Sequence, residues 1–215
     1  MNFLDDSTYV EWNKVRFGWL LNKYGSGYFQ GKTILELGAG SGALGQKFAR
    51  CGAKVTCVEG RFNHVRSGRK LYPKLKFVHM NLEKKGELLN LGKFDIVIHF
   101  GTLYHLKNYE SNLREALQLC RKVMFLETEV MDSTEDEVLM IEENKKSPDQ
   151  AISGFGAKPS PANVERIIRS CGFRPKVQLD AKLNLEELHV YDWELQNSKA
   201  WKPGRRRFWV VTKND

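Results

Sequence analysis

The sequence predicts an α/β fold in which helices cover both faces of a doubly wound, mostly parallel sheet, with an antiparallel edge hairpin formed by the C-terminal strands. Short apolar runs alternate with helical patterns over the first two-thirds of the chain. One run, FDIVIHFG at residues 94–101, is almost wholly apolar, as expected for a parallel strand covered on both faces. Two strand-like runs at residues 186–195 and 206–214 are expected to pair antiparallel at the sheet edge.

The predicted elements follow one another in a regular order. Strands are expected at residues 32–38, 53–60, 75–83, 94–101 and 123–130. Helices are expected at residues 8–24, around Leu44, Phe48 and Cys51, at 109–122 and at 159–173. In the last of these helices, Ser160 and Pro161 suit the N-cap and first-turn positions, and Gly172 marks the end.

Length and composition indicate one domain. With 215 residues, of which 41% are hydrophobic, the chain can bury a single core, and we expect one domain over residues 1–215. Residues 1–12 lack the pattern of a signal peptide, and no apolar run reaches the roughly 18 residues of a membrane helix. For that reason we expect no membrane partner. The four cysteines show no metal-type clustering, so we also expect no metal site and a reducing, cytoplasmic compartment.

Charge is distributed unevenly along the chain, whose net charge is +8. Residues 61–76 hold six basic side chains and no acid, and residues 202–207 hold four more. Two interpretations are open: these runs follow the phosphates of a nucleic acid, or they are solvated faces. Between Glu127 and Asn144 there are eight acids and no base, which disfavours a uniform nucleic-acid surface.

A glycine-rich loop, ILELGAGSGALG at residues 34–45, can be read in two registers. Gly38, Gly40 and Gly42 form one set, and Gly40, Gly42 and Gly45 spell the G-x-G-x-x-G of dinucleotide-binding proteins. In either register the loop joins a strand to a helix N-terminus and lets a ligand approach the backbone. Glu59 follows at the end of the second strand, where an acid binds ribose hydroxyls. The loop therefore predicts a Rossmann-like nucleoside site.

Glu36 separates the two registers. It lies two residues before the first glycine, where the dinucleotide fingerprint usually has an apolar residue. There a carboxylate can hold the ammonium of a methionine moiety, which NAD lacks. A strand-end carboxylate bonded to nearby amides is the alternative interpretation of this residue.

With these residues the sequence resembles the class I S-adenosylmethionine-dependent methyltransferases. The acid and glycines of ELGAGSG match the first motif of that family, and FDIVIHFGTLYHL matches its fourth-strand motif. The resemblance implies S-adenosyl-L-methionine as cofactor, S-adenosyl-L-homocysteine as product, and a cofactor-binding core at residues 32–131 between an N-terminal helical segment at 1–31 and an acceptor side at 132–215. It implies these cofactor-binding residues: Glu36, Gly38, Ala39, Gly40, Gly42, Glu59, Gly60, Asn81, Leu82, Phe100 and Gly101.

A narrower resemblance concerns GTLYHL at residues 101–106, LETEV at 126–130 and the segment at 159–173. These are similar to a branch that contains tRNA wobble-uridine (carboxy)methyltransferases and bacterial small-molecule and sugar methyltransferases. The branch leaves open whether the donor is ordinary or carboxylated S-adenosylmethionine.

His105 and Tyr104 are the candidate catalytic residues, since they directly follow the fourth strand, at the mouth where open α/β sheets bind ligands. A histidine there suits a general base for an acceptor hydroxyl. The alternatives are a histidine that fixes the loop through a backbone hydrogen bond and a tyrosine that packs.

Two alternating sets could also face the acceptor. Glu127 and Glu129 share one face of the fifth strand. Two interpretations are open: one of them orients an acceptor, or both begin a solvated acidic segment. His189, Tyr191 and Trp193 also share one face. Two interpretations are open: their rings stack on a sugar or base, or they pack in the core or at the sheet edge.

The sequence thus predicts a methyltransferase that acts on a hydroxyl of a small-molecule or sugar acceptor. The alternatives are a tRNA or other nucleic-acid methyltransferase, a non-catalytic cofactor-binding or partner-binding module and, more distantly, an NAD-dependent oxidoreductase.

Overall fold

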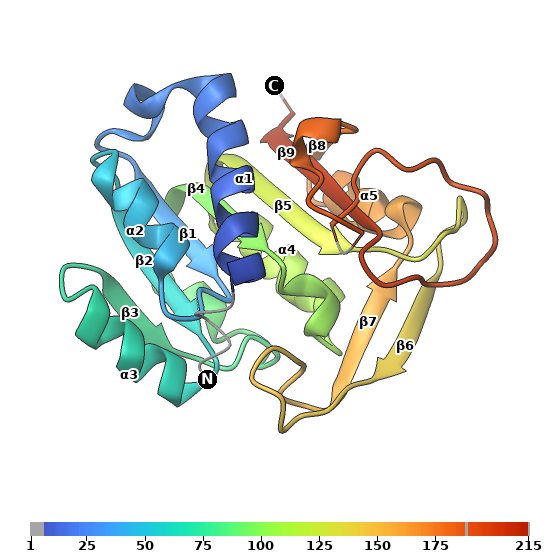
Figure 1. Cartoon of the computed structure of the whole chain (residues 1–215), viewed down its shortest axis with the longest axis horizontal. Coiled ribbons are helices and arrows are strands. Elements are labelled where there is room, and N and C mark those ends of the chain that lie inside the picture. Colours follow the sequence, from blue (N-terminus) through green and yellow to red (C-terminus); the bar gives the residue numbers. More distant parts are fainter. Residues whose placement is uncertain (1–6, 188, 215) are drawn as a thin grey trace.

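The computed structural model describes residues 7–187 and 189–214 and contains a seven-stranded sheet with helices on both faces (Figure 1). The strand order is β3-β2-β1-β4-β5-β9-β8. The strands are β1 (Thr33–Leu37), β2 (Lys54–Glu59), β3 (Lys76–His79), β4 (Phe94–Phe100), β5 (Cys120–Glu129), β8 (Phe173–Val177) and β9 (Arg206–Lys213). The predicted fold class is confirmed. The first six residues of the predicted N-terminal segment lie outside the described residues.

The first five strands run parallel, and the sheet ends in an antiparallel edge. β1 pairs with β2 on one side and with β4 on the other. The chain therefore adds β2 and β3 on one side of β1 and then returns to add β4 and β5 on the other side, so the order of the strands reverses at β1. β9 pairs antiparallel with both β5 and β8. Open parallel sheets bind ligands at the carboxyl ends of the strands beside such a reversal. This arrangement places the candidate site after β1 and β4.

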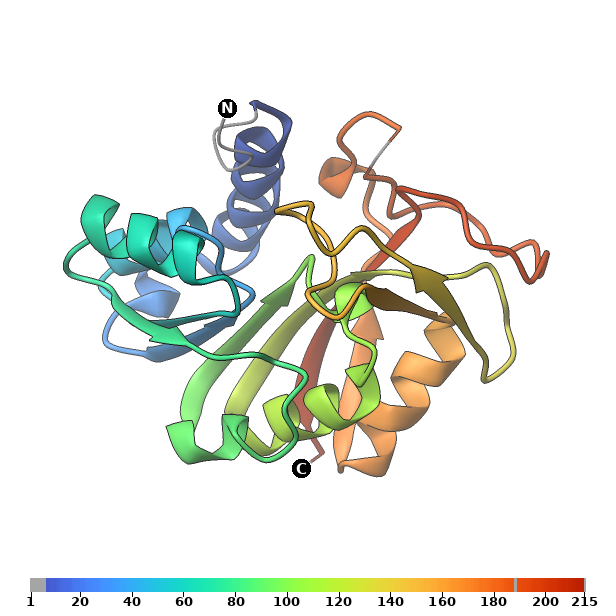
Figure 2. The ribbon, with the colours of Figure 1, turned by 90° about the horizontal axis from the view of Figure 1, so that it is seen from below.

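The sheet separates the core into two layers, each covered by helices. The helices are α1 (Ser7–Tyr24), α2 (Ala43–Arg50), α3 (Phe62–Leu71), α4 (Tyr109–Leu119) and α5 (Pro161–Ser170). Successive strand residues alternate between the layers: Ile96 and Ile98 pack with residues of α1, α2 and α3, whereas Val97 packs with those of α4 and α5. Figure 2 shows the sheet from another side, with α4 and α5 below it. As predicted, α5 begins with a capping bond, in which Asn163 N donates to Ser160 Oγ at 3.0 Å.

The predicted strand at residues 186–195 is wrong. The described residues of that segment make only the isolated bridges Leu185 to His189 and Val190 to Arg205, and the partner of β9 is β8 instead. β8 contains Pro175, which has no backbone N–H and is tolerated because β8 is an edge strand. Of the alternating residues in this segment, His189 lies in the wall of a cavity, whereas Tyr191 and Trp193 pack against the core, as the packing alternative had it.

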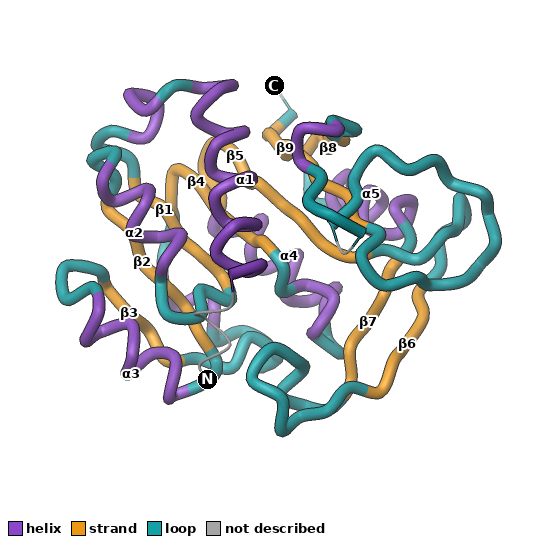
Figure 3. Tube along the Cα trace, in the orientation of Figure 1, coloured by secondary structure: helices purple, strands orange, loops and turns teal. Residues whose placement is uncertain are grey.

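A second, two-stranded sheet was not predicted. Its strands β6 (Val138–Glu142) and β7 (Phe155–Pro159) pair antiparallel and lie beside the main sheet, joined by a connection at residues 143–154 (Figure 3). β7 contacts the short 3₁₀ helix η4 (Leu103–His105) that follows β4. The hairpin therefore reaches the segment that carries the predicted catalytic residues.

Among the described residues, no helix combines the length and apolar character needed to cross a membrane.

Candidate active site

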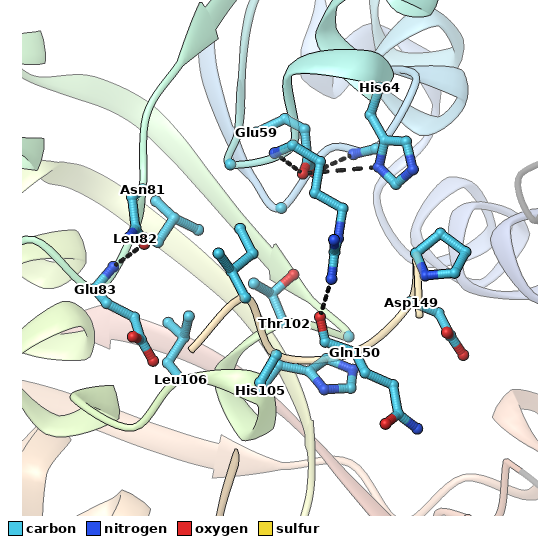
Figure 4. A pocket seen from close by; sticks show the side chains of 18 of the residues that line it. Glu59, His64, Asn81, Leu82, Glu83, Thr102, His105, Leu106, Asp149 and Gln150 are labelled. Atoms are coloured by element: carbon cyan, nitrogen blue, oxygen red, sulfur yellow. Dashed lines mark hydrogen bonds and ion pairs between the residues drawn. The ribbon is translucent and has the colours of Figure 1, made fainter. Parts of the chain in front are cut away.

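A first cavity of about 120 Å³ lies at the carboxyl ends of β1, β2, β3 and β4 (Figure 4). Its wall brings together one predicted catalytic residue, His105, and seven of the predicted cofactor-binding residues: Gly38, Gly40, Glu59, Gly60, Asn81, Leu82 and Gly101. In Figure 4, Glu59 and His64 lie on one side of this cavity and His105 and Gln150 on the other. The cavity wall does not include Glu36, Ala39, Gly42 or Phe100.

Gly38 is required by the close approach of two loops. Its φ is +68°, a conformation that favours glycine, and an added Cβ would lie 1.9 Å from Thr102 Oγ1. Thr102 follows β4, so the loops after β1 and β4 touch here. This contact fixes the floor of the first cavity.

Glu59 is held as a buried carboxylate facing the glycine loop. Its Oε2 accepts from Gly40 N at 2.9 Å and its Oε1 from Arg61 N at 2.8 Å, with His64 Nδ1 3.7 Å away. Burial by itself would raise the pKa of Glu59, but the contacts with His64, Arg61 and Gly40 outweigh burial and lower it. An ionised carboxylate at this position is a pure acceptor, which suits a ribose diol.

The Glu36 carboxylate lies behind the glycine loop. Its Oε2 accepts from Cys57 Sγ at 3.5 Å, and an added Cβ on Gly45 would lie 2.6 Å from the same oxygen. Burial raises the pKa of Glu36 to about 7. These contacts correspond to the strand-end alternative, and they explain the third glycine of G-x-G-x-x-G as space for this carboxylate. The ammonium-binding role of Glu36 stays a prediction.

The connection at residues 143–154 covers the first cavity. Pro148, Asp149, Gln150, Ala151 and Ile152 belong to the cavity wall. Arg61 Nη2 donates to the carbonyl oxygens of Ser147 and Gln150, both at 2.7 Å, and so ties this connection to the end of β2. Ligand sites usually have volumes of roughly 300–1,000 Å³, so the first cavity, at about 120 Å³, is small for a ligand site, and residues of this connection form part of its wall.

A second cavity, of about 660 Å³, adjoins the first. The two share Tyr9, Gly101, His105, Asp149 and Gln150 in their walls. Aromatic and charged side chains form much of the second cavity: Trp12, Tyr104, Glu129, Lys158, His189, Trp201 and Arg206. His105 therefore stands where a nucleoside-type cavity meets a larger mixed-polarity cavity.

Alternating charges run beneath the second cavity. Successive side chains lie between 2.6 and 3.7 Å apart and carry opposite charges up to the terminal histidine. Their order is Arg16, Glu127, Arg206, Glu129, Lys158, Glu143 and His105. We call these seven residues the buried charge chain. Its three carboxylates balance its three permanent cations, so the chain buries no unpaired charge before His105 is reached.

His105 ends the buried charge chain through Glu143. His105 Nδ1 lies 2.6 Å from Glu143 Oε2, which also accepts from Ala151 N at 2.8 Å. Burial would raise the pKa of Glu143, but His105 and Lys158 hold it at about 2. Because an ionised carboxylate only accepts, Nδ1 carries the proton, and in the neutral ring Nε2 keeps a lone pair. Nε2 has no hydrogen-bond partner among the described residues.

Tyr104 is buried against the same chain. Its hydroxyl accepts from Arg206 Nη2 at 3.2 Å, its ring lies 4.0 Å from that of His105 between centroids, and Lys158 Nζ is 4.4 Å from its ring centre. Burial strongly raises its pKa, so the phenol stays protonated. Tyr104 lies in the second cavity rather than the first.

The structure changes the interpretation of two charged segments. Glu127 and Glu129 are buried and paired with Arg206, so the solvated alternative for them is wrong. In the basic run at residues 202–207, Arg206 and Arg207 are also buried, which neither a phosphate track nor a solvated face anticipated. Glu143 and Lys158 were not singled out from the sequence, because only the unpredicted hairpin brings them to His105.

The residues of the first cavity fit an adenosine-and-methionine ligand in kind. Glu59 supplies a carboxylate, Gly38 and Gly40 expose backbone, and Asn81 and Leu82 supply an amide and an apolar side chain. Asn81 Oδ1 already accepts from Glu83 N at 3.0 Å, which fixes the amide so that its nitrogen is the free end.

Sequence comparison identifies the protein family that this chain matches. A family model described as "Methyltransferase domain" matches residues 13–179. No curated protein matches the chain.

Solved structures share the fold at low sequence identity. The N-terminal domain of EvdMO1 with SAH bound is 20% identical, with a TM-score of 0.68, 94% of this chain covered and 80% of that one. Magnesium protoporphyrin IX methyltransferase (ChlM) from Synechocystis PCC 6803 with bound SAM is 16% identical, with a TM-score of 0.61 and coverages of 100% and 85%. Burkholderia thailandensis 1,6-didemethyltoxoflavin-N1-methyltransferase is 17% identical, with a TM-score of 0.58 and coverages of 99% and 81%.

Proposed function

Because the chain belongs to the methyltransferase domain family, as a class I S-adenosylmethionine-dependent methyltransferase, we propose that it transfers the methyl group to a hydroxyl of a small-molecule or sugar acceptor. The observation that carries this proposal is the position of His105 where the two cavities meet, with Nδ1 held by Glu143.

The first cavity is proposed to hold the cofactor. Glu59 binds the ribose hydroxyls, Gly38 and Gly40 lie against the ligand through their backbone, and Asn81 and Leu82 flank the adenine. Gly60 and Gly101 complete the wall, while Glu36, Ala39, Gly42 and Phe100 support it from behind. When bound, S-adenosylmethionine supplies a methyl group on a positively charged sulfur.

The second cavity is proposed to hold the acceptor. Its volume of about 660 Å³ suits a small molecule, and its wall combines aromatic rings with fixed polar groups. Structures of the same fold concern small molecules: EvdMO1 was studied in the presence of SAH and D-fucose, and another by its name acts on 1,6-didemethyltoxoflavin. Tyr104 and His105 both reach this cavity.

His105 is proposed as the general base. The acceptor hydroxyl gives its proton to Nε2 as its oxygen bonds to the methyl carbon, and the electron pair of the broken carbon–sulfur bond stays on sulfur. Glu143 keeps the ring in the tautomer with a free Nε2 and stabilises the imidazolium that forms. Tyr104 and the connection at residues 143–154 help to exclude water, and alignment of the reacting atoms supplies roughly 7–11 kcal/mol.

The acceptor class is tested by incubating the purified protein with methyl-labelled S-adenosylmethionine and a lysate of its native host, separated into nucleic-acid, protein and small-molecule fractions. Label in the small-molecule fraction supports the proposal. Label released by nuclease would favour a nucleic-acid acceptor instead, and cofactor binding with no label in any fraction would favour a non-catalytic module.

The exposed basic run does not adjoin the acceptor cavity. Its exposed members Arg66, Arg69 and Lys70 lie on α3, which the two views place on the far side of the molecule from β6 and β7 (Figures 1 and 2). A nucleic-acid acceptor would need basic surface around the second cavity. Charge reversal at Arg66, Arg69 and Lys70 should therefore leave turnover of a small acceptor unchanged.

A further inference from the structure

One oxygen of the Glu143 carboxylate contacts two different parts of the site. Oε2 lies 2.6 Å from His105 Nδ1 and accepts from Ala151 N at 2.8 Å. Ala151 is 1% exposed and belongs to the wall of the first cavity, in the connection at residues 143–154. The proposed base and the segment that covers the proposed cofactor site are therefore joined through a single atom.

The position of this carboxylate is fixed by its other oxygen. Glu143 Oε1 accepts from Lys158 Nζ at 2.9 Å, and the side chain is 5% exposed. An added Cβ on Gly156 would lie 2.2 Å from Oε1 and 2.5 Å from the carbonyl oxygen of Tyr104. The φ of Gly156 is not positive, so the close approach of these atoms explains the glycine, and not an unusual backbone conformation. β7 thus leaves the space that the carboxylate occupies.

Two further side chains tie the connection to the cofactor side of the molecule. Arg61 Nη2 donates to the carbonyl oxygens of Ser147 and Gln150, both at 2.7 Å. Ser153 Oγ donates to Glu83 Oε1 at 3.1 Å. Arg61 follows β2 and Glu83 follows β3, whereas the carboxylate contact with the connection lies beside the segment after β4. The connection is thus held at the ends of several strands that border the first cavity.

Ile152 gives the connection an apolar surface beside the cofactor position. An added Cβ on Gly60 would lie 2.5 Å from Ile152 Cδ1 and 3.9 Å from the Cα of Asn81. These three residues therefore meet in the wall of the first cavity, where Asn81 is proposed to flank the adenine. Ile152 is 41% exposed. A ligand that fills the cavity removes part of this apolar surface from water and so favours the covered arrangement.

We propose that Glu143 is a positioning residue with two linked roles: it holds the connection at residues 143–154 over the bound cofactor, and it orients His105. The Ala151 N–H fixes the same oxygen that faces Nδ1, so the covering connection and the oriented imidazole belong to one arrangement. Contacts of the cofactor with the connection favour that arrangement, and by linkage the loss of the carboxylate weakens retention of the cofactor. The role toward His105 rests on the proposed function, whereas the role toward the cofactor does not depend on the acceptor.

The test compares the dissociation rate of S-adenosylhomocysteine from the wild type, Glu143→Gln and Glu110→Gln. The first substitution replaces an ionised acceptor with an amide beside Lys158 and Ala151. The second is a control, because Glu110 lies on α4 outside both cavities. We expect S-adenosylhomocysteine to leave Glu143→Gln at least about 10-fold faster, as for loss of a charged hydrogen bond, and to leave the control at the wild-type rate.

A second measurement uses the wild type and needs no acceptor. The Ala151 amide exchanges its hydrogen only when its bond to the carboxylate opens. S-adenosylhomocysteine should therefore slow this exchange at least about 5-fold. In Glu143→Gln the same amide should exchange faster than in the wild type. An Ala151 amide that exchanges equally with and without S-adenosylhomocysteine would overturn the proposal.

The outcomes separate this inference from the proposed function. Equal dissociation of S-adenosylhomocysteine from Glu143→Gln and the wild type would show that the carboxylate does not hold the connection, whatever acceptor is methylated. Faster dissociation from Glu143→Gln, in a protein whose wild type labels no small molecule, would support cofactor retention while the proposed function fails.

Discussion

His105 Nδ1 and Glu143 Oε2 lie 2.6 Å apart, although 38 residues separate them in the sequence. The contact joins the segment after β4 to the β6–β7 hairpin and terminates the buried charge chain. Glu143 is itself held by Lys158 Nζ at 2.9 Å, so the imidazole is oriented by a side chain that cannot turn away.

Substitution of either partner should lower the rate of methyl transfer. We expect His105→Gln to lower the maximal rate at least about 100-fold, because general-base catalysis contributes roughly 100- to 10,000-fold. Glu143→Gln should lower it at least about 10-fold, because an amide can donate to Nδ1 and so stabilise the wrong tautomer. The measurement is labelling of the small-molecule fraction, with S-adenosylhomocysteine affinity followed by calorimetry.

Glu110→Gln is the matched control for Glu143→Gln, because Glu110 pairs with Arg114 on the partly exposed face of α4 and lies in neither cavity. This control should behave as the wild type. An unchanged rate in Glu143→Gln, with an intact fold, would mean that the pair only fixes the loop.

Glu36→Gln tests the ammonium role predicted from the sequence. S-adenosylhomocysteine carries the amino-acid ammonium, whereas 5′-methylthioadenosine lacks it. If Glu36 binds that group, the substitution should weaken the first ligand about 10-fold, as expected for a charged hydrogen bond of about 1.5 kcal/mol, and leave the second unchanged. Equal losses for both ligands would assign Glu36 to its contacts with Gly45 and Cys57 alone.

Arg61→Leu should loosen the connection over the first cavity. The substitution removes the two 2.7 Å bonds to Ser147 and Gln150. Hydrogen bonds of charged groups contribute about 1.5–3 kcal/mol each, so we expect S-adenosylhomocysteine to dissociate at least about 10-fold faster. Backbone amides of residues 144–153 should also exchange faster. Arg66→Leu, on the exposed face of α3, which begins directly after Arg61, should change neither quantity. Identical dissociation from both variants would show that Arg61 does not hold this connection.

Two buried histidines should make the fold sensitive to acid. Burial lowers the pKa of His99 to about 4 and that of His189 to about 3, from 6.5 in the unfolded chain. Below pH 6.5 the unfolded chain binds protons that the folded protein excludes, so stability falls as the pH falls toward these values. Each residue should cost about 2 kcal/mol at pH 5.

His189→Phe should recover about one of these two contributions when urea unfolding is compared at pH 7 and pH 5. A loss of stability as large as that of the wild type would show that His189 is charged in the folded protein.

Local sequence patterns were sufficient to predict the central strands of the sheet and the start of α5. β1, β2 and β4 were visible as short apolar runs, and the caps of α5 were read correctly from Ser160 and Pro161. Strand type is easier to predict than partner choice, because pairing depends on residues far apart in the chain. The segment at 186–195 shows this, since its alternation was real but its backbone pairs with β9 hardly at all.

The candidate site was predictable only where it follows the strands. Glu59 and His105 were expected because each lies at or just after the end of a strand that meets the same edge of the sheet, and Asn81 was expected from the family resemblance. Glu143 and Lys158 could not be expected, because a hairpin outside the main sheet carries them to His105. The burial of Arg206 was equally hidden, since its partners Glu127 and Glu129 lie on β5, nearly 80 residues earlier.

The most direct test of the central claim is the identity of the atom that receives the methyl group. The wild type and His105→Gln would be incubated with S-adenosylmethionine carrying a ¹³C-methyl group and the small-molecule fraction of the host lysate, and the product examined by carbon NMR. The account predicts a methyl group bonded to oxygen, formed by the wild type and at least about 100-fold more slowly by the variant. A methyl group bonded to nitrogen, carbon or sulfur, or an equal rate in the variant, would contradict it.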